Sequence, residues 1–286
     1  MREGTVRANG IEFAYIEEGD GPVVLLLHGY PDIAQTWDAQ MHALAAAGYR
    51  AVAPNSRGYP PTEVPANGYY DAATLANDII GLIDELAGEP VYYAGHDWGA
   101  ATGYRTVAAH PEHFKRVAML AIPHPLSMFM NILANPAHIM GVFHFWFFQM
   151  QGLAEEALRA NDMAMIDFLW KLWAPKLDEP EHRAAVKRAL AHPGALEASI
   201  AYYRAAMGTM PGDPALADQQ GALNGPTAVP TLTIVGSEDP NGRNAQAQAP
   251  FFTGPMEVVT VEGTGHFLHR EKPDDVSKLL VDWFAG

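Results

Sequence analysis

An acidic side chain stands at the centre of the most informative motif in this 286-residue sequence. Asp97 lies in Gly-His-Asp-Trp-Gly (residues 95–99), which follows a short apolar run at residues 91–94 and precedes a helical pattern. A strand, a tight turn with small residues around its centre, and a helix together present a side chain as a nucleophile. Taken alone the pattern is weak, because an Asp at this position can also cap the following helix.

Two further side chains complete a candidate catalytic triad with Asp97. Asp239 comes directly after the apolar run at residues 232–235, and His266 stands in a loop before the last helical pattern. The order nucleophile, acid, histidine is the chain order of α/β-hydrolase triads, whose members gather at strand ends. The three residues together therefore predict a nucleophile (Asp97), a general base (His266) and an acid that orients the base (Asp239).

A fourth element supplies hydrogen-bond donors. Leu-His-Gly-Tyr-Pro at residues 27–31 ends an early strand with a turn whose backbone can offer an N–H group. We expect the backbone N–H groups of Tyr30 and Trp98 to form an oxyanion hole.

The choice of aspartate at the nucleophile position restricts the reaction. A carboxylate is a poor attacker of carbonyl groups, because the anhydride that forms falls back to the reactants, whereas it suits attack at an sp3 carbon. The product would be an alkyl ester on Asp97. This ester is hydrolysed when His266 deprotonates a water that attacks the ester carbonyl. The departing group would be an alkoxide in an epoxide or a halide in a haloalkane.

The remaining sequence predicts the scaffold. Short apolar runs bounded by turn residues are typical of buried parallel strands, and they alternate with helical patterns, so we expect an α/β fold with a mostly parallel, doubly wound sheet. The runs are residues 23–27, 51–53, 91–94, 117–120 and 232–235, and the helical patterns are residues 34–47, 71–87, 99–109 and 274–284. Strand signals are missing in between, which predicts a core domain of residues 1–125 and 228–286 carrying a helical cap of residues 126–227.

Composition excludes several function classes. The net charge of −15, from 33 acidic and 18 basic residues, disfavours partners such as nucleic acid and anionic membranes. The chain has no cysteine and no apolar signal segment at its start, and we expect a cytoplasmic monomer or homodimer. We expect no metal and no cofactor, since the histidine spacings at residues 110–113 and 266–269 lack the carboxylate pattern of metalloproteases.

On these motifs the sequence resembles the epoxide hydrolase branch of the α/β-hydrolases over nearly its whole length. Residues 28–31 match that family's His-Gly-x-Pro motif, and residues 95–99 match its Gly-x-Asp-x-Gly elbow. The resemblance implies that water opens a small hydrophobic epoxide, apolar or aryl rather than charged, to a vicinal diol. It also implies a cap tyrosine that holds the epoxide oxygen, which maps onto Tyr203, with Tyr202 as the neighbouring alternative.

The second oxygen-binding residue departs from the family pattern. Where a second tyrosine is usual, this chain has His144, ahead of Phe-Trp-Phe-Phe at residues 145–148. This segment resembles a bacterial subgroup of epoxide hydrolases that uses a His and Tyr pair. An imidazole N–H can donate a hydrogen bond to the oxygen as a phenol does. The alternative is that His144 only satisfies a backbone group among core aromatic residues.

Two other functions stay open. Haloalkane dehalogenases share the Asp-Trp-Gly elbow but typically have Asn at the position of Tyr30, and haloacid-type enzymes would need Arg at the position of Trp98. The chain lacks both ligands, so a dehalogenase is the weaker alternative. A non-catalytic ligand-binding protein on the same fold is more remote, because Asp97, Asp239 and His266 are all present.

Overall fold

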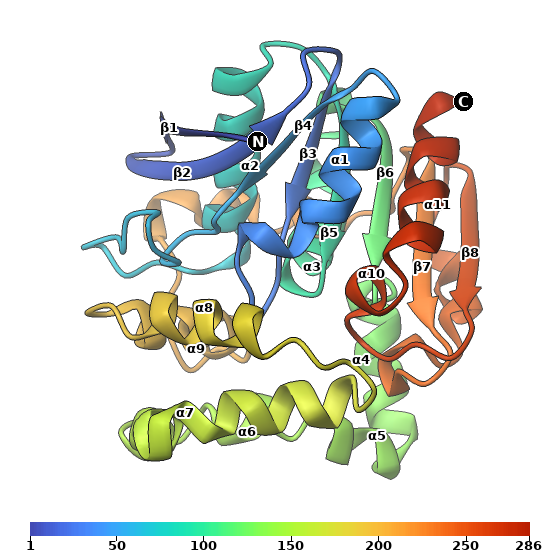
Figure 1. Ribbon diagram of the computed structural model, residues 1–286. Coiled ribbons are helices and arrows are strands. Elements are labelled where there is room, and N and C mark those ends of the chain that lie inside the picture. The colour runs from blue at the N-terminus through green and yellow to red at the C-terminus, as the bar shows by residue number, and fades with distance from the viewer.

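A single eight-stranded sheet forms the centre of the molecule, as seen in the computed structural model (Figure 1), which describes residues 1–286 except the side chains of residues 136 and 137. The strand order is β1-β2-β4-β3-β5-β6-β7-β8. The pairs β1/β2 and β2/β4 are antiparallel, and the other pairs are parallel. The strands are β1 (Arg2–Ala8), β2 (Ile11–Glu18), β3 (Val23–Leu27), β4 (Arg50–Pro54), β5 (Val91–His96), β6 (Phe114–Leu120), β7 (Thr231–Gly236) and β8 (Met256–Val261).

Helices cover both faces of the sheet. Helix α1 (Asp38–Ala46) contacts α11 (Pro273–Ala285), and α2 (Ala72–Leu86) contacts α3 (Trp98–Ala109). The two pairs lie on opposite sides of the strands in Figure 1. Every residue of β3 and β7 is buried, as expected for parallel strands with helices on both faces. The predicted doubly wound α/β fold is confirmed.

The edge strand β8 is absent from the sequence prediction. Its residues alternate between exposed and partly buried positions, and only Val261 is fully buried. An edge strand with one solvent-exposed face lacks the continuous apolar run that is typical of the central strands. A smaller difference concerns residues 34–47, whose first turn is a 3-10 helix, η1 (Ala34–Trp37), that precedes α1.

Six α-helices lie between β6 and β7. They gather beyond the carboxyl ends of the strands, at the lower side of the molecule in Figure 1. They are α4 (Pro125–Ala134), α5 (Pro136–Gly141), α6 (His144–Phe147), α7 (Leu153–Trp173), α8 (Pro180–Leu190) and α9 (Ala195–Ala206). Most buried hydrophobic residues of α7, α8 and α9 belong to a second hydrophobic cluster, separate from the cluster around the sheet.

Helix α7 is interrupted near its middle. Asn161, Asp162 and Met163 have positive φ, and Ala160 has an extended ψ of 147°. The interruption divides α7 into two helical pieces. Across the described residues, none of the helices combines the length and apolarity needed to span a bilayer.

Candidate active site

Asp97 occupies a sharp turn between β5 and α3. Its backbone has φ 52° and ψ −115°, a conformation that L residues rarely adopt. The turn depends on small neighbours: a Cβ on Gly95 would lie 2.4 Å from the Gly99 carbonyl carbon, and a Cβ on Gly99 would lie 2.2 Å from the Leu27 oxygen. The Asp97 side chain makes no capping hydrogen bond to α3. The alternative in which Asp97 merely caps this helix is therefore wrong.

The structure brings the three predicted triad residues together. His266 Nδ1 lies 2.8 Å from Asp239 Oδ2, and His266 Nε2 lies 3.5 Å from Asp97 Oδ2. The second oxygen of Asp239 accepts a hydrogen bond from the Asn241 amide at 2.8 Å. Asp239 and His266 are buried, and Asp97 keeps 15% of its side chain exposed. The imidazole thus lies between two carboxylates with one ring nitrogen directed at each.

Neighbouring charges and hydrogen bonds shift the pKa values of both His266 and Asp97. Burial alone would lower the pKa of His266, but the charges and hydrogen bonds of Asp239 and Asp97 outweigh it and raise the pKa to about 10. Burial likewise would raise the pKa of Asp97, yet His266, His96 and the Tyr30 amide bring it below its usual value. At neutral pH the site therefore holds an imidazolium next to an ionised nucleophile.

The two oxygens of Asp97 have different surroundings. The Tyr30 backbone N–H donates to Asp97 Oδ1 at 2.8 Å, whereas Oδ2 faces His266. Trp98 begins α3 directly after the nucleophile, so its backbone N–H is among the helix's first, unpaired donors. The predicted donors thus lie on either side of Asp97. This geometry assigns Oδ1 to the donor turn and Oδ2 to His266.

His144 and Tyr203 face each other on the helical side of the site. Their ring centroids are 5.2 Å apart with planes at 82°, and both side chains are buried. Asp97, His144 and His266 border one small cavity of about 20 Å³. That volume has room for about one water molecule. His144 therefore shares this cavity with the nucleophile, and Tyr203 packs against His144 and against the Trp98 ring.

Both members of this pair are neutral. Burial lowers the pKa of His144 to about 3, and the nearby charge of Asp97 only partly opposes this shift. Burial and the charge of Asp97 raise the pKa of Tyr203, while a hydrogen bond with the Trp98 side chain lowers it slightly. Within the described part of the chain, His144 Nδ1 is buried without a hydrogen-bond partner. The alternative of a histidine that satisfies a backbone group therefore finds no support in its contacts.

Tyr202 has a different environment. Its hydroxyl donates to the Arg57 carbonyl oxygen at 2.8 Å, in a loop of the core. Its pKa is raised by burial and by Asp78, with no contribution from Asp97 among its principal causes, whereas Asp97 does act on Tyr203. Adjacent helical residues point about 100° apart, so only one of the two faces the nucleophile. That residue is Tyr203.

Several contacts that hold the site were not predicted. The His266 amide donates to the Trp173 carbonyl at the end of α7 at 2.9 Å, and Trp170 Nε1 donates to the Pro31 carbonyl at 3.1 Å. His182 on α8 pairs with buried Asp32 at 2.6 Å. These contacts join the inserted helices to the loops that carry the triad and Tyr30. They connect residues far apart in sequence, so no local pattern could have indicated them.

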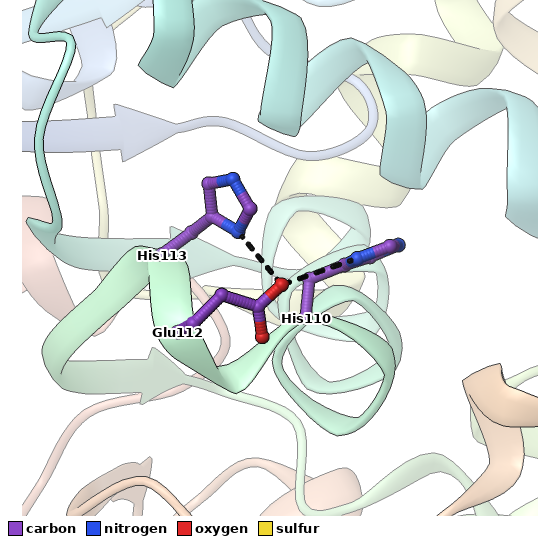
Figure 2. A group of neighbouring side chains, drawn as sticks. All are labelled: His110, Glu112 and His113. Atoms are coloured by element: carbon purple, nitrogen blue, oxygen red, sulfur yellow. Dashed lines mark ion pairs between the residues drawn. The ribbon is translucent and has the colours of Figure 1, made fainter.

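A histidine and glutamate group lies away from this site. Figure 2 shows Glu112 between His110 and His113, and its Oε1 lies 3.8 Å and 3.4 Å from their Nδ1 atoms. The three ligand atoms are close enough to share an ion. Glu112 is 65% exposed, however, and the His113 ring also pairs with Asp84 at 3.8 Å. The group is accounted for by weak surface ion pairs.

The sequence matches the protein family described as alpha/beta hydrolase fold over residues 22–273. This chain belongs to the α/β-hydrolase family. It is 31% identical to the AB hydrolase superfamily protein YfhM of Bacillus subtilis (strain 168), covering 98% of this chain and 97% of that protein. It is also 31% identical to Epoxide hydrolase 3 of Siraitia grosvenorii, covering 98% and 96%.

A solved epoxide hydrolase structure has the same fold as this α/β-hydrolase. The crystal structure of epoxide hydrolase VrEH1 from Vigna radiata superposes with a TM-score of 0.81 at 28% identity, covering 99% of this chain and 98% of that one. The predicted resemblance to the epoxide hydrolase branch is confirmed. The narrower resemblance to a subgroup with a His and Tyr pair stays a prediction.

Proposed function

We propose that this α/β-hydrolase opens a hydrophobic epoxide to a vicinal diol through an ester on Asp97. The observation that carries the proposal is the placement of two neutral hydrogen-bond donors, His144 and Tyr203, beside an ionised aspartate in the nucleophile turn. An alkoxide leaving group needs such donors, whereas a halide does not need a proton. The names of the relatives support the same activity.

The first step forms the ester. Asp97 Oδ2 attacks an epoxide carbon, a C–O bond of the ring breaks, and the released oxygen accepts hydrogen bonds from Tyr203 and His144. The alkoxide takes up a proton from this donor pair. His266 then donates a proton to the pair and becomes neutral. In the same step Asp97 loses its negative charge. One of the groups that raise the pKa of His266 is therefore removed by the reaction itself.

The second step regenerates the enzyme. Neutral His266, oriented by Asp239, deprotonates a water that attacks the ester carbonyl carbon of Asp97. The negative charge then develops on Oδ1, where the Tyr30 amide already donates, with the Trp98 amide as the second donor. Collapse of the intermediate expels the diol oxygen, which takes the second proton of the attacking water, so Asp97 is again a carboxylate and His266 keeps the first proton. The sum of both steps is epoxide plus water giving diol.

The inserted helices carry the selectivity in this proposal. We assign residues 126–227 as the cap domain and residues 1–125 with 228–286 as the core domain. Asp97 borders a cavity of about 220 Å³ whose wall is mainly apolar, including Ile122, Met128 and Phe145. Such a wall suits apolar or aryl substituents on the epoxide. A cytoplasmic location and a monomeric or homodimeric state stay predictions from the sequence.

A direct product assay tests the proposal. Purified protein is incubated with styrene oxide, and diol is followed by chromatography; parallel reactions with 1-chlorohexane and fluoroacetate are followed by halide release. We expect diol formation that disappears in Asp97→Asn and no halide release above background. Halide release without diol formation would replace the proposal with a dehalogenase.

A further inference from the structure

His182 on α8 makes a buried contact with the core. Its Nε2 lies 2.6 Å from Asp32 Oδ1; the His182 side chain is 9% exposed and that of Asp32 is fully buried. Buried charges are normally paired, because desolvation of an unpaired charge is costly. Burial would raise the pKa of Asp32, but the charge and hydrogen bond of His182, together with the charge of Arg270, bring it below its usual value. His182 is therefore the main partner of an ionised carboxylate inside the protein.

Asp32 belongs to the turn that carries the oxyanion donor. It lies two residues after Tyr30, whose amide donates to Asp97 Oδ1 at 2.8 Å. On the other side of Tyr30 the turn is fixed to the core, because His28 Nε2 accepts a hydrogen bond from the Ser56 amide at 2.9 Å. The donor amide thus lies between two fixed points. The first depends on the core alone, and the second depends on α8.

Helix α7 holds the same turn at the preceding residue. Trp170 Nε1 donates to the Pro31 carbonyl oxygen at 3.1 Å. The Trp170 ring stacks on Phe267 with centroids 3.9 Å apart, and the His182 ring lies 5.6 Å from it on α8. Two inserted helices therefore hold two successive residues of the turn, directly after the residue that supplies the donor amide.

The position of the Tyr30 amide affects the two steps of the reaction differently. During ester formation the negative charge leaves Asp97, so a donor at Oδ1 stabilises the reactant at least as much as the transition state. Displacement of this donor does not slow the attack. During ester hydrolysis the charge develops on Oδ1, and the same donor stabilises the transition state. A residue that only positions this amide therefore acts on hydrolysis alone.

We propose that His182 is a positioning residue for ester hydrolysis, which holds the Tyr30 amide at Oδ1 of Asp97 through its contact with Asp32. This role rests on the epoxide hydrolase function proposed above, since it belongs to the second step of that reaction. It gives the inserted helices a part in the hydrolysis of the ester, in addition to the donors that hold the epoxide oxygen.

Single-turnover kinetics with styrene oxide test the role of His182, with the ester followed by rapid quench and intact-protein mass spectrometry. His182→Phe keeps a ring beside Trp170 and removes the donor to Asp32. We expect the rate constant of ester hydrolysis to fall by about 10- to 100-fold, because the oxyanion donor is displaced but still present. The rate constant of alkylation should stay at the wild-type value, so the ester accumulates.

Two further variants control for folding and for loss of charge. His182→Gln retains an N–H donor and should recover most of the hydrolysis rate. Arg183→Met changes the next residue of α8, whose ion pairs with Asp167 and Asp178 stay within the inserted segment, and both of its rate constants should match the wild type. Equal slowing of both steps in His182→Phe would show that His182 only seats the inserted helices and would overturn the proposal, as would unchanged hydrolysis.

A double variant tests whether His182 acts through Asp32. Asp32→Leu removes the acceptor and should slow hydrolysis by a factor similar to that of His182→Phe. The double variant should be no slower than the slower single variant, because each substitution removes the same contact. Losses that multiply in the double variant would show that the two residues act independently and would contradict the proposed path to the Tyr30 amide.

An NMR measurement separates this inference from the proposed function, because it needs no turnover. In protein labelled with ¹⁵N-tyrosine, the Tyr30 amide is the signal that Tyr30→Phe removes. An amide proton that donates to a carboxylate resonates downfield, and we expect it to move upfield in His182→Phe and to keep its position in Arg183→Met.

An unmoved Tyr30 signal in His182→Phe, in a protein that forms diol, would overturn only the role of His182. A displaced signal in a protein that forms no diol would support the positioning of Tyr30 by His182 and contradict the epoxide hydrolase function.

Discussion

The two histidines of the site differ in charge, and the difference follows from the part of the molecule that carries each one. His266 comes from the core, where Asp239 and Asp97 hold its ring by ionic contacts and raise its pKa to about 10. His144 comes from the inserted helices, where aromatic rings surround it and burial lowers its pKa to about 3. The same side chain is thus a cation on one side of Asp97 and a neutral group on the other.

This contrast suits a two-step reaction. The core side needs charges that hold a nucleophile and activate water, whereas the cap side needs neutral donors that can follow an oxygen as it becomes negative. A second cation at His144 would compete with His266 for the Asp97 carboxylate and weaken its nucleophilicity. The expected consequences range from loss of all turnover to a change in pH stability.

The largest effect is expected at the nucleophile. Asp97→Asn removes the charge but keeps the shape, and Asn tolerates the positive φ of this turn. Diol formation should fall by about 10⁴-fold or more, while the thermal midpoint changes little. Steady-state assays and circular dichroism melts measure both quantities. Residual turnover within 10-fold of the wild type would contradict a nucleophilic role.

The next effect separates the two steps on the core side. His266→Gln removes the base for ester hydrolysis and leaves Asp97 in place, so steady-state turnover should fall about 10³-fold or more. Intact-protein mass spectrometry should show a mass gain equal to one substrate, located on the peptide that contains Asp97. Loss of turnover without this adduct would contradict the assignment of His266 as the base for ester hydrolysis.

The cap side should show a smaller and different loss. His144→Phe and Tyr203→Phe each remove one donor to the opening oxygen, and each should slow alkylation by about 10- to 100-fold without accumulation of ester. Rapid-quench kinetics under single-turnover conditions measure this step. Tyr202→Phe is the matched control and should change alkylation less than about 3-fold. If the Tyr202 variant proves slower than the Tyr203 variant, the assignment within α9 is reversed.

The smallest effect concerns stability against pH. The pKa of His144 is lower in the folded protein than in the unfolded chain, so the unfolded chain binds more protons between about pH 6.5 and pH 3, and stability is lost as pH falls through that window. His266 has the opposite sign: its contribution is complete below pH 6.5 and is lost as pH rises toward 10. In His144→Phe the acid-side loss should be shallower, by up to about 1.4 kcal/mol per pH unit.

Urea unfolding at a series of pH values between 4 and 7 measures this slope. The exposed His192→Gln variant is the control and should follow the wild type. Identical acid slopes in His144→Phe and the wild type would show that His144 is not held neutral in the folded protein.

Local sequence was enough to predict the core side of the site. Asp97, Asp239 and His266 each sit beside a strand end or a loop with its own turn residues, and the sheet topology brings such positions together. The cap side could be predicted only through family resemblance, because nothing in residues 144–148 or 201–205 fixes which ring faces Asp97.

Other features depend on contacts between distant segments and had no signal in the sequence. The His182 and Asp32 pair joins residues 150 positions apart. The edge strand β8 was missed since its pattern is half polar. Packing, rather than local propensity, decides these two features.

In the proposed mechanism Asp97 itself attacks the substrate, and a single turnover in water enriched in ¹⁸O tests this attack. With enzyme in excess over an aryl epoxide, the diol oxygen should come from the unlabelled carboxylate, and the label should enter the peptide that contains Asp97. Mass spectrometry measures the ¹⁸O content of the diol and of the peptide. A first-turnover diol that carries ¹⁸O, with no label in the peptide, would show that water rather than Asp97 attacks the epoxide.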